Sequence, residues 1–308
     1  MLPFLKSSSF SPTRRSQPGG KISGTRLPLL SSFILARLAL TVLAGFPAQA
    51  KPWNPQNIER IEANGHNPLY FAVMGDSREG DAVFQKILKD LNQIPELAFA
   101  VHLGDLVPGG GADAYAHFFR LIAPFKRPLL TVAGNHELRG MDAAGLYRQI
   151  FGPANYAFRV GPHHFLVLNN NSPKDVDTKT LRWLEEELEK GKEAQTRIIF
   201  MHKPLFNLHR GSQHALDETT VQALLDLFKR HRVTHIFAAH IHAYFTGNWE
   251  GIPFTISGGA GAPLYPWEPS HSFYHYLTVK LSGENVGVEM HRIAAPPKLA
   301  EPAGGPGG

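Results

Sequence analysis

The sequence contains no cysteine. This absence excludes disulfide bonds, cysteine-ligated zinc, iron–sulfur clusters, a thiol nucleophile and a cysteine-linked lipid. Beyond residue 50 the sequence also lacks an apolar run of the roughly 20 residues that cross a membrane. Because 43% of the 308 residues are hydrophobic and only 19% are charged, a wholly disordered chain is excluded and a large buried core is expected.

Acidic residues are missing from positions 1–50, which hold six basic side chains. The other 258 residues carry 25 basic and 26 acidic side chains, so the whole net charge of +5 comes from this leader. A nucleic-acid-binding protein is expected to carry a basic surface on its folded part. We therefore expect no nucleic-acid partner.

Residues 1–50 have the three parts of a secretory signal peptide. A basic segment precedes the apolar run Leu38–Phe46 and a small-residue site, Pro-Ala-Gln-Ala, that ends at Ala50. We predict cleavage after Ala50 and a periplasmic or secreted mature protein without stable membrane insertion. The alternative is an uncleaved anchor over Leu27–Phe46, which Arg37 disfavours because it would place a charge inside the span.

Short apolar runs alternate with helical spacing of apolar residues in the first half of the chain. The runs 69–74, 99–103 and 129–133 end in Gly-Asp, Gly-Asp and Gly-Asn, and are followed by helical patterns over 84–91, 114–122 and 142–150. Buried strands alternating with helices predict a layered α/β fold.

The second half predicts a second sheet. Residues 156–160 and 163–168 resemble a hairpin, 198–202 and 233–239 are apolar strands, and 180–190 and 219–231 have helical patterns. Strand-like segments follow at 252–257, 274–281 and 285–293. The Pro/Gly-rich end, 294–308, is expected to be a disordered tail, which leaves one domain over 51–293.

Potential metal ligands recur at the carboxyl ends of the apolar strands. Such ends converge on one crevice in α/β folds, and carboxylate, amide and imidazole groups suit Mn, Fe, Zn or Ni. This number of ligands fits a pair of ions better than one tetrahedral ion. The candidates are Asp76, Asp105, Asn135, His202, His240 and His242. Six histidines outside this set are expected at the surface or at a pocket rim: His163, His164, His209, His214, His271 and His275.

Five ordered motifs resemble those of the calcineurin-like metallophosphoesterases. They are Gly75-Asp76, Gly104-Asp105, Gly134-Asn135-His136-Glu137, Met201-His202 and His240-Ile241-His242. The resemblance implies a four-layer α/β/β/α sandwich of two mixed sheets flanked by helices, with the metal site at the strand ends. It also implies a phosphatase or phosphodiesterase, with some likeness to purple acid phosphatases.

The resemblance further implies a role for each motif residue. Asp105 would bridge two divalent or trivalent metal ions, with Asp76 and His242 on the first and Asn135, His202 and His240 on the second. A metal-bridging hydroxide would attack phosphorus in line. His136 would stand beside the leaving oxygen as a general acid or as a hydrogen-bond donor in the transition state.

The first motif departs from the family pattern. Most members have Asp-x-His there, whereas this chain has Asp76-Ser77-Arg78, and arginine cannot act as a ligand. The purple acid phosphatases supply a tyrosine three residues after the bridging aspartate, a position held here by Pro108. The first ion is therefore expected to be weakly held or absent. Arg78 is either a clamp for a phosphate oxygen or a surface residue of the loop.

Two other functions fit parts of the sequence. Gly75-Asp76-Ser77 resembles the first motif of the GDS-type serine esterases, but the Gly-x-Asn-Asp and late Asp-x-x-His motifs of that family are missing. A non-catalytic protein that binds phosphate or metal on a phosphoesterase scaffold is the second alternative. For an enzyme, the expected partner is a small phosphoester substrate, whose identity and preferred ester class the sequence leaves open.

Overall fold

The computed structural model describes residues 51–63, 68–171, 176–207, 216–266 and 269–295. The predicted signal peptide over 1–50, residues 296–308 of the predicted tail over 294–308, and His209 and His214 lie outside the described residues, so the expectations for them stay predictions. Among the described residues, no helix combines the length and the apolar character needed to cross a membrane.

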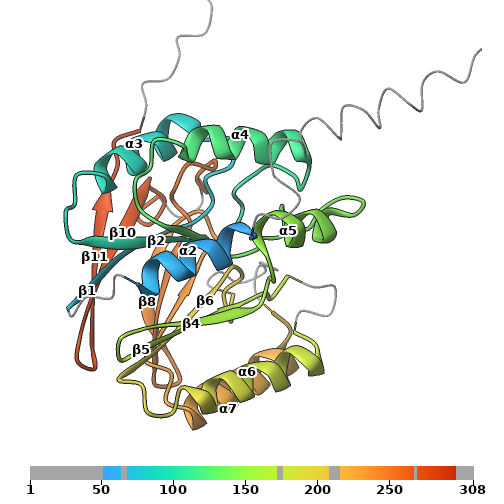
Figure 1. Ribbon diagram of the computed structural model, residues 1–308, viewed down its shortest axis with the longest axis vertical. Coiled ribbons are helices and arrows are strands. Elements are labelled where there is room, and N and C mark those ends of the chain that lie inside the picture. The colour runs from blue at the N-terminus through green and yellow to red at the C-terminus, as the bar shows by residue number, and fades with distance from the viewer. Residues whose placement is uncertain (1–50, 64–67, 172–175, 208–215, 267–268, 296–308) are drawn as a thin grey trace, which may run out of the picture. The chain divides into compact units, whose positions relative to one another are not determined.

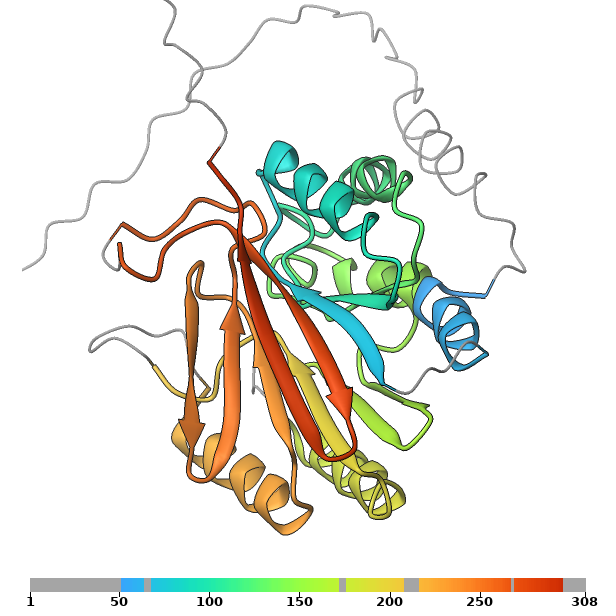
Figure 2. The same cartoon turned by 90° about the vertical axis from the view of Figure 1, so that its left-hand side faces the viewer.

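A five-stranded sheet carries the first three sequence motifs (Figures 1 and 2). Its strand order is β11-β10-β1-β2-β3, with β1, β2 and β3 parallel, β10 antiparallel to β1 and β11 antiparallel to β10. The strands are β1 (Leu69–Met74), β2 (Leu97–His102), β3 (Leu129–Thr131), β10 (His275–Ser282) and β11 (Asn285–Arg292).

A six-stranded sheet carries the last two motifs, with strand order β4-β5-β6-β7-β9-β8. Strands β5, β6, β7 and β9 are parallel, whereas β4 and β8 are antiparallel edge strands. The strands are β4 (Tyr156–Val160), β5 (His163–Leu168), β6 (Thr196–Met201), β7 (His235–Ala238), β8 (Tyr244–Trp249) and β9 (Ile252–Ser257). The predicted hairpin at 156–168 is present.

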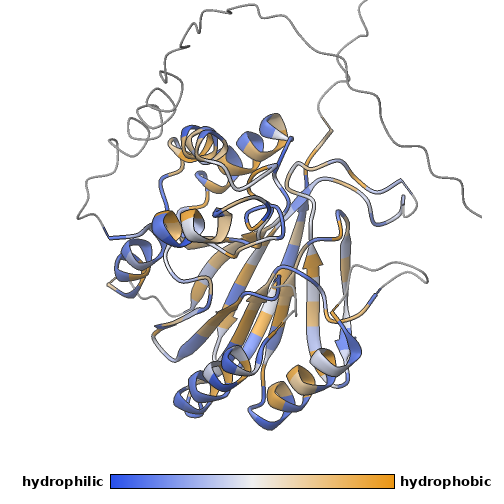
Figure 3. Ribbon diagram, turned by 90° about the vertical axis from the view of Figure 1, so that its right-hand side faces the viewer, coloured by the Kyte–Doolittle hydropathy of each residue, from blue (hydrophilic) through white to orange (hydrophobic). Residues whose placement is uncertain are grey.

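The two sheets pack face to face through aromatic side chains. Phe71 of β1 lies 5.6 Å from Phe165 of β5 and 6.0 Å from Phe200 of β6, measured between ring centroids. Because side chains alternate along a strand, Ala72 and Met74 point the other way, into the core beneath the helices. Figure 3 shows hydrophobic positions interspersed along the strands of both sheets.

Helices cover the outer face of each sheet. Side chains of α3, α4 and α5 pack with one face of the first sheet, and those of α6 and α7 pack with the outer face of the second. The fold is therefore the expected α/β/β/α sandwich. The helix bounds are α3 (Asp81–Leu91), α4 (Ala112–Ile122), α5 (Ala143–Phe151), α6 (Thr178–Lys190) and α7 (Glu218–Arg230).

One further helix, α2 (Trp53–Glu62), was not predicted from the sequence. Its buried positions include Asn54 and Asn57, so the helical spacing of apolar residues is weak there. The Asn54 side chain instead pairs with Thr131 in β3, accepting from its backbone N–H at 3.0 Å. Because α2 is anchored partly by an amide side chain, its sequence shows no clear helical spacing of apolar residues.

The prediction that six histidines outside the motifs lie at the surface or at a pocket rim was wrong for three of them. His163 and His275 are completely buried and His164 is 2% exposed. His163 contacts the Thr196 hydroxyl at 2.9 Å, and His275 contacts the Ser257 hydroxyl at 3.0 Å. A hydroxyl partner allows a neutral imidazole to be buried at low cost.

Buried neutral histidines make the fold sensitive to acid. Burial lowers the pKa values of His235 and His275 from 6.5 to about 4. Between pH 6.5 and 4 the unfolded chain therefore binds protons that the folded chain does not, and stability falls with falling pH. We expect each of these histidines to contribute a loss of about 1.4 kcal/mol per pH unit in this range.

His235→Gln tests this expectation, because glutamine keeps a polar contact to Thr255 but does not titrate. Urea unfolding of the metal-free protein between pH 4 and 6.5 should show a shallower pH dependence for the variant than for the wild type. Equal pH dependence in the two proteins would contradict a buried neutral imidazole at this position.

Candidate metal centre

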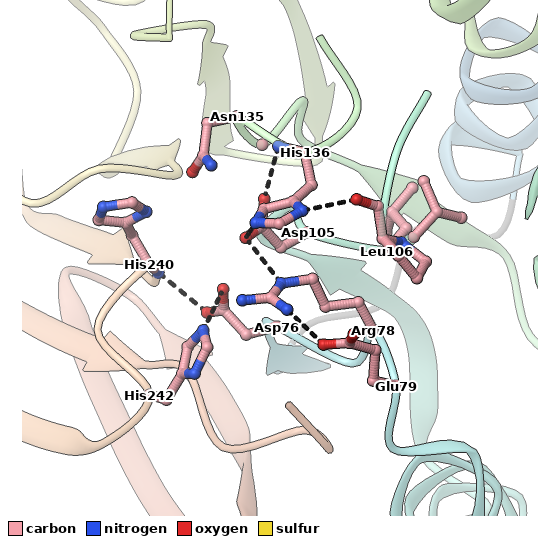
Figure 4. A network of polar contacts seen from close by, with 12 residues as sticks. Asp76, Arg78, Glu79, Asp105, Leu106, Asn135, His136, His240 and His242 are labelled. Atoms are coloured by element: carbon pink, nitrogen blue, oxygen red, sulfur yellow. Dashed lines mark hydrogen bonds and ion pairs between the residues drawn. The ribbon is translucent and has the colours of Figure 1, made fainter. Parts of the chain in front are cut away.

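The six predicted ligands come from loops that directly follow parallel strands. Asp76, Asp105 and Asn135 follow strands β1, β2 and β3, and His202 follows β6. His240 and His242 follow β7. The loops of both sheets meet at one edge of the sandwich, where Figure 4 shows five of these side chains gathered around a common space.

The side chains form two groups that share one carboxylate. Ligand atoms of Asp105, His202 and His240 lie within 4.8 Å of one another, and so do those of Asp76, Asp105 and His242. We call Asp76, Asp105 and His242 the first group, and Asp105, His202 and His240 the second group. Asn135 adjoins the second group, with its Oδ1 3.0 Å from His202 Nε2. The structure thus brings all six predicted residues together, whereas their roles as ligands stay predictions.

The polar atoms of the first group fit a bound cation. Asp76 is completely buried, and its Oδ2 accepts a hydrogen bond from the His240 backbone N–H at 2.9 Å. Its Oδ1 has no hydrogen-bond partner among the described residues and lies 3.5 Å from His242 Nε2. An unpaired buried carboxylate oxygen is costly, and a metal ion at this point would satisfy it.

Backbone carbonyls orient two of the imidazoles toward the centre. His202 Nδ1 donates to the Leu103 carbonyl at 2.8 Å, and His242 Nδ1 donates to the Pro263 carbonyl at 2.6 Å. In the neutral ring this leaves the Nε2 lone pair of each histidine facing the aspartates, as a metal ligand requires. The carboxylate oxygens and imidazole nitrogens of both groups therefore suit the transition metals expected from the sequence.

Left-handed backbone conformations position three of the candidate ligands. The φ angles are 60° at Asp76, 55° at Asp105 and 68° at His240, values uncommon for residues other than glycine. Such strain is frequent at functional sites. Gly104 permits the turn before Asp105, because a Cβ there would lie 2.8 Å from His202 Nδ1.

Glu137 holds the turn that carries Asp105. Its buried carboxylate accepts backbone N–H bonds from Asp105, Leu106 and Val107 at 2.8, 2.8 and 3.2 Å, and from Gly134 at 2.7 Å. Burial and the nearby Asp105 carboxylate raise the pKa of Glu137 to about 8, which the N–H donors oppose. Glu137 belongs to the Gly-Asn-His-Glu motif, but no role for it could be predicted from the sequence.

His136 and Arg78 both contact the shared carboxylate. The His136 backbone N–H donates to Asp105 Oδ1 at 3.1 Å, and its Nε2 lies 3.7 Å from Oδ2. Arg78 Nε donates to the same Oδ2 at 3.4 Å, and Nη1 donates to Glu79 at 2.6 Å. The Arg78 side chain is 16% exposed and lies against Asp105, and its role as a phosphate clamp stays a prediction.

Tyr265 is a second residue that the sequence did not reveal. Its ring stacks on His242 with a centroid distance of 4.8 Å, and its hydroxyl donates to the His240 carbonyl at 3.3 Å. It thereby supports the two histidines of the final motif. No motif marks Tyr265, and only the folded chain places it beside them.

Comparisons with known proteins agree with this geometry. A family model described as calcineurin-like phosphoesterase matches residues 69–244. A serine/threonine-protein phosphatase of Rattus norvegicus is 28% identical over 151 residues, covering 44% of this chain and 48% of the relative. A probable cyclic nucleotide phosphodiesterase of Rhodopseudomonas palustris is 25% identical over 181 residues, covering 54% and 64%. The chain therefore spans roughly half to two thirds of the length of these relatives.

The fold also resembles solved structures. A purple acid phosphatase from yellow lupin (Lupinus luteus) superposes with a TM-score of 0.59 at 16% sequence identity, covering 73% of this chain and 51% of that one. At this identity the likeness concerns the fold alone.

Replacing one acceptor oxygen of Glu137 should loosen the centre. In Glu137→Gln, an NH₂ group replaces one acceptor oxygen and faces backbone N–H donors. We expect a loss of about 2–4 kcal/mol in the free energy of unfolding, measured in urea, and weaker Mn²⁺ binding. The exposed Glu185→Gln on α6 is the matched control and should resemble the wild type. Unchanged stability in Glu137→Gln would contradict the role of this carboxylate.

Proposed function

The chain belongs to the calcineurin-like phosphoesterase family, and from this membership and the geometry of its centre we propose that it is a metal-dependent hydrolase of phosphate mono- or diesters. The observation that carries the proposal is the pair of ligand groups sharing Asp105. One shared carboxylate between two groups is the arrangement that suits two ions in a hydrolytic site.

The chain's own residues have distinct tasks in this proposal. Asp76, Asp105 and His242 would hold the first ion, and Asp105, Asn135, His202 and His240 would hold the second. When bound, such ions supply Lewis-acid activation of water and neutralise phosphoryl charge. The buried carboxylates and the carbonyl-oriented imidazoles fix the donor atoms before substrate arrives, so little reorganisation is needed during the reaction.

His136 and Arg78 act on the substrate. His136 Nε2 lies close to the shared carboxylate, where it can donate a proton or a hydrogen bond to the leaving oxygen. The guanidinium of Arg78 can turn from Asp105 to a phosphate oxygen, for which its planar set of donors is suited. Two relatives named as a phosphatase and as a probable phosphodiesterase leave both ester classes open.

The proposed site of action is outside the cytoplasm, as the signal-like sequence of residues 1–50 indicates. Detection of a mature amino terminus at Lys51 by mass spectrometry of the secreted or periplasmic fraction would support export. An intact leader on the membrane would support the uncleaved anchor.

The serine-esterase alternative is disfavoured by the position of Ser77. Its hydroxyl lies 2.9 Å from His102 Nε2, and both side chains are buried, at 3% and 0% exposure. The His102 ring lies in the core, against Phe84 and Phe118. A nucleophile must reach its substrate, and this hydroxyl faces away from solvent.

Metal removal and two substitutions test the proposal together. Hydrolysis of matched aryl phosphate mono- and diesters by the purified protein should require Mn²⁺ and stop with a chelator. Asp105→Asn should lower kcat/KM at least about 1,000-fold, because both ligand groups lose their shared carboxylate. Ser77→Ala should retain activity within a few-fold, and the exposed Asp226→Asn on α7 is the control.

Activity that survives chelation but is lost in Ser77→Ala would identify a serine esterase instead. Metal and phosphate binding without turnover of any ester would support the non-catalytic alternative.

The proton-donor role of His136 predicts a dependence on the leaving group. A nitrophenolate leaves without protonation, whereas an alkoxide needs a proton. In His136→Ala we therefore expect kcat/KM to fall roughly 100-fold or more for an alkyl phosphate, and clearly less for nitrophenyl phosphate. Equal losses on the two esters would mean that His136 acts through charge or position alone.

A further inference from the structure

The guanidinium of Arg78 contacts one oxygen of the shared carboxylate, and the other oxygen faces the second group. Asp105 Oδ1 faces the second group, 3.4 Å from His202 Nε2, and accepts the His136 backbone N–H. Asp105 Oδ2 is the oxygen that Arg78 Nε contacts, at 3.4 Å. The two oxygens of Asp105 therefore have different partners. Figure 4 shows the guanidinium pointing toward the carboxylates of Asp76 and Asp105.

The guanidinium of Arg78 is held by two carboxylates. Asp105 contacts its inner side through Nε. Glu79, half exposed, holds the outer side of the guanidinium through Nη1. Arg78 is thus fixed between an exposed carboxylate and a buried one.

The two ligand groups consequently differ in strength. The second group has one carboxylate, two imidazoles and the adjoining amide oxygen of Asn135. The first group has two carboxylates and one imidazole, and a permanent positive charge lies beside it. That charge repels an incoming cation and contacts Oδ2 of Asp105, the carboxylate that the first group shares.

We infer that the resting protein retains one metal ion, at the second group, and that Arg78 keeps the first group weak and exchangeable. This inference rests on the proposed metal centre and specifies its occupancy. The unpaired Asp76 Oδ1 indicates that the first group remains able to accept an ion, because Arg78 does not satisfy that oxygen. The first ion then depends on the free metal concentration, whereas the second stays bound.

Titration of the metal-free full chain with Mn²⁺, followed by electron paramagnetic resonance of the free ion, measures this directly. We expect one tight equivalent and a second that binds about 10- to 1,000-fold more weakly. Low-temperature spectra should show an isolated Mn²⁺ at one equivalent and a coupled pair only at excess metal. This readout does not depend on catalysis.

Three substitutions of Arg78 separate its charge from the missing ligand. Arg78→Lys keeps the charge and should resemble the wild type. Arg78→Gln removes the charge without adding an imidazole, and should strengthen the second equivalent at least about tenfold. Arg78→His adds a donor as well and should bind two equivalents tightly. Adding Asp76→Asn to Arg78→His should return the protein to one tight equivalent, which places the gained ion at the first group.

Two results would overturn the inference. Two tight equivalents in the wild type would show that Arg78 does not weaken the first group. Equal Mn²⁺ binding by the wild type and Arg78→Gln would show that its charge is not the cause, even if Arg78→His gains an ion. Circular dichroism and thermal unfolding of each variant confirm that the fold is retained. Failure of the proposed function is a separate result: the predicted metal binding without hydrolysis of any phosphate ester.

Discussion

The centre depends on one buried interaction, the acceptance of four backbone N–H groups by the carboxylate of Glu137. These bonds fix the turn after β2 to the loop after β3 and hold Asp105 in its left-handed conformation. Because Asp105 is the only residue common to both ligand groups among the described residues, any movement of this turn would displace both at once. A second buried carboxylate so close to Asp105 raises the electrostatic cost of the metal-free fold, and backbone donors offset part of that cost.

The aromatic core between the sheets sets the distance between the two halves of the centre. Asp76 and Asp105 come from the first sheet, whereas His202, His240 and His242 come from the second. Rigid packing of Phe71 against Phe165 and Phe200 keeps the strand ends of the two sheets at a fixed separation. Close-packed cores transmit small shifts rather than absorbing them, so the geometry of the ligands depends on side chains far from the loops.

The sequence was sufficient to predict the layers and the gathering of the ligands, because both follow from short-range patterns. Apolar runs ending in Gly-Asp or Gly-Asn mark parallel strands, and the carboxyl ends of such strands converge. The sequence was insufficient where a role depends on a partner far along the chain. The four donors of Glu137, the stacking of Tyr265 on His242 and the pairing of Asn54 with Thr131 appear only once the chain is folded. His163 and His275 were mistaken for surface or pocket-rim residues for the same reason, because the hydroxyl that pairs with each of them lies on another strand.

The carboxylate of Asp105 can pair with the Arg78 guanidinium or bind a metal ion, and these two interactions compete. Without any ion, Asp76 and Asp105 are buried negative charges, and the guanidinium beside them offsets part of the resulting penalty. An imidazole at that position would be a ligand, but as a neutral group it would leave the metal-free fold without this compensation. The permanent charge therefore favours a stable metal-free centre, and the affinity of the first group for its ion is correspondingly lower. When a phosphate ester binds, its negative charge can draw the guanidinium away from Asp105 Oδ2 and free that oxygen for a cation. If the proposed function holds, occupancy of the first group and binding of substrate would be coupled through a single side chain, and each would favour the other.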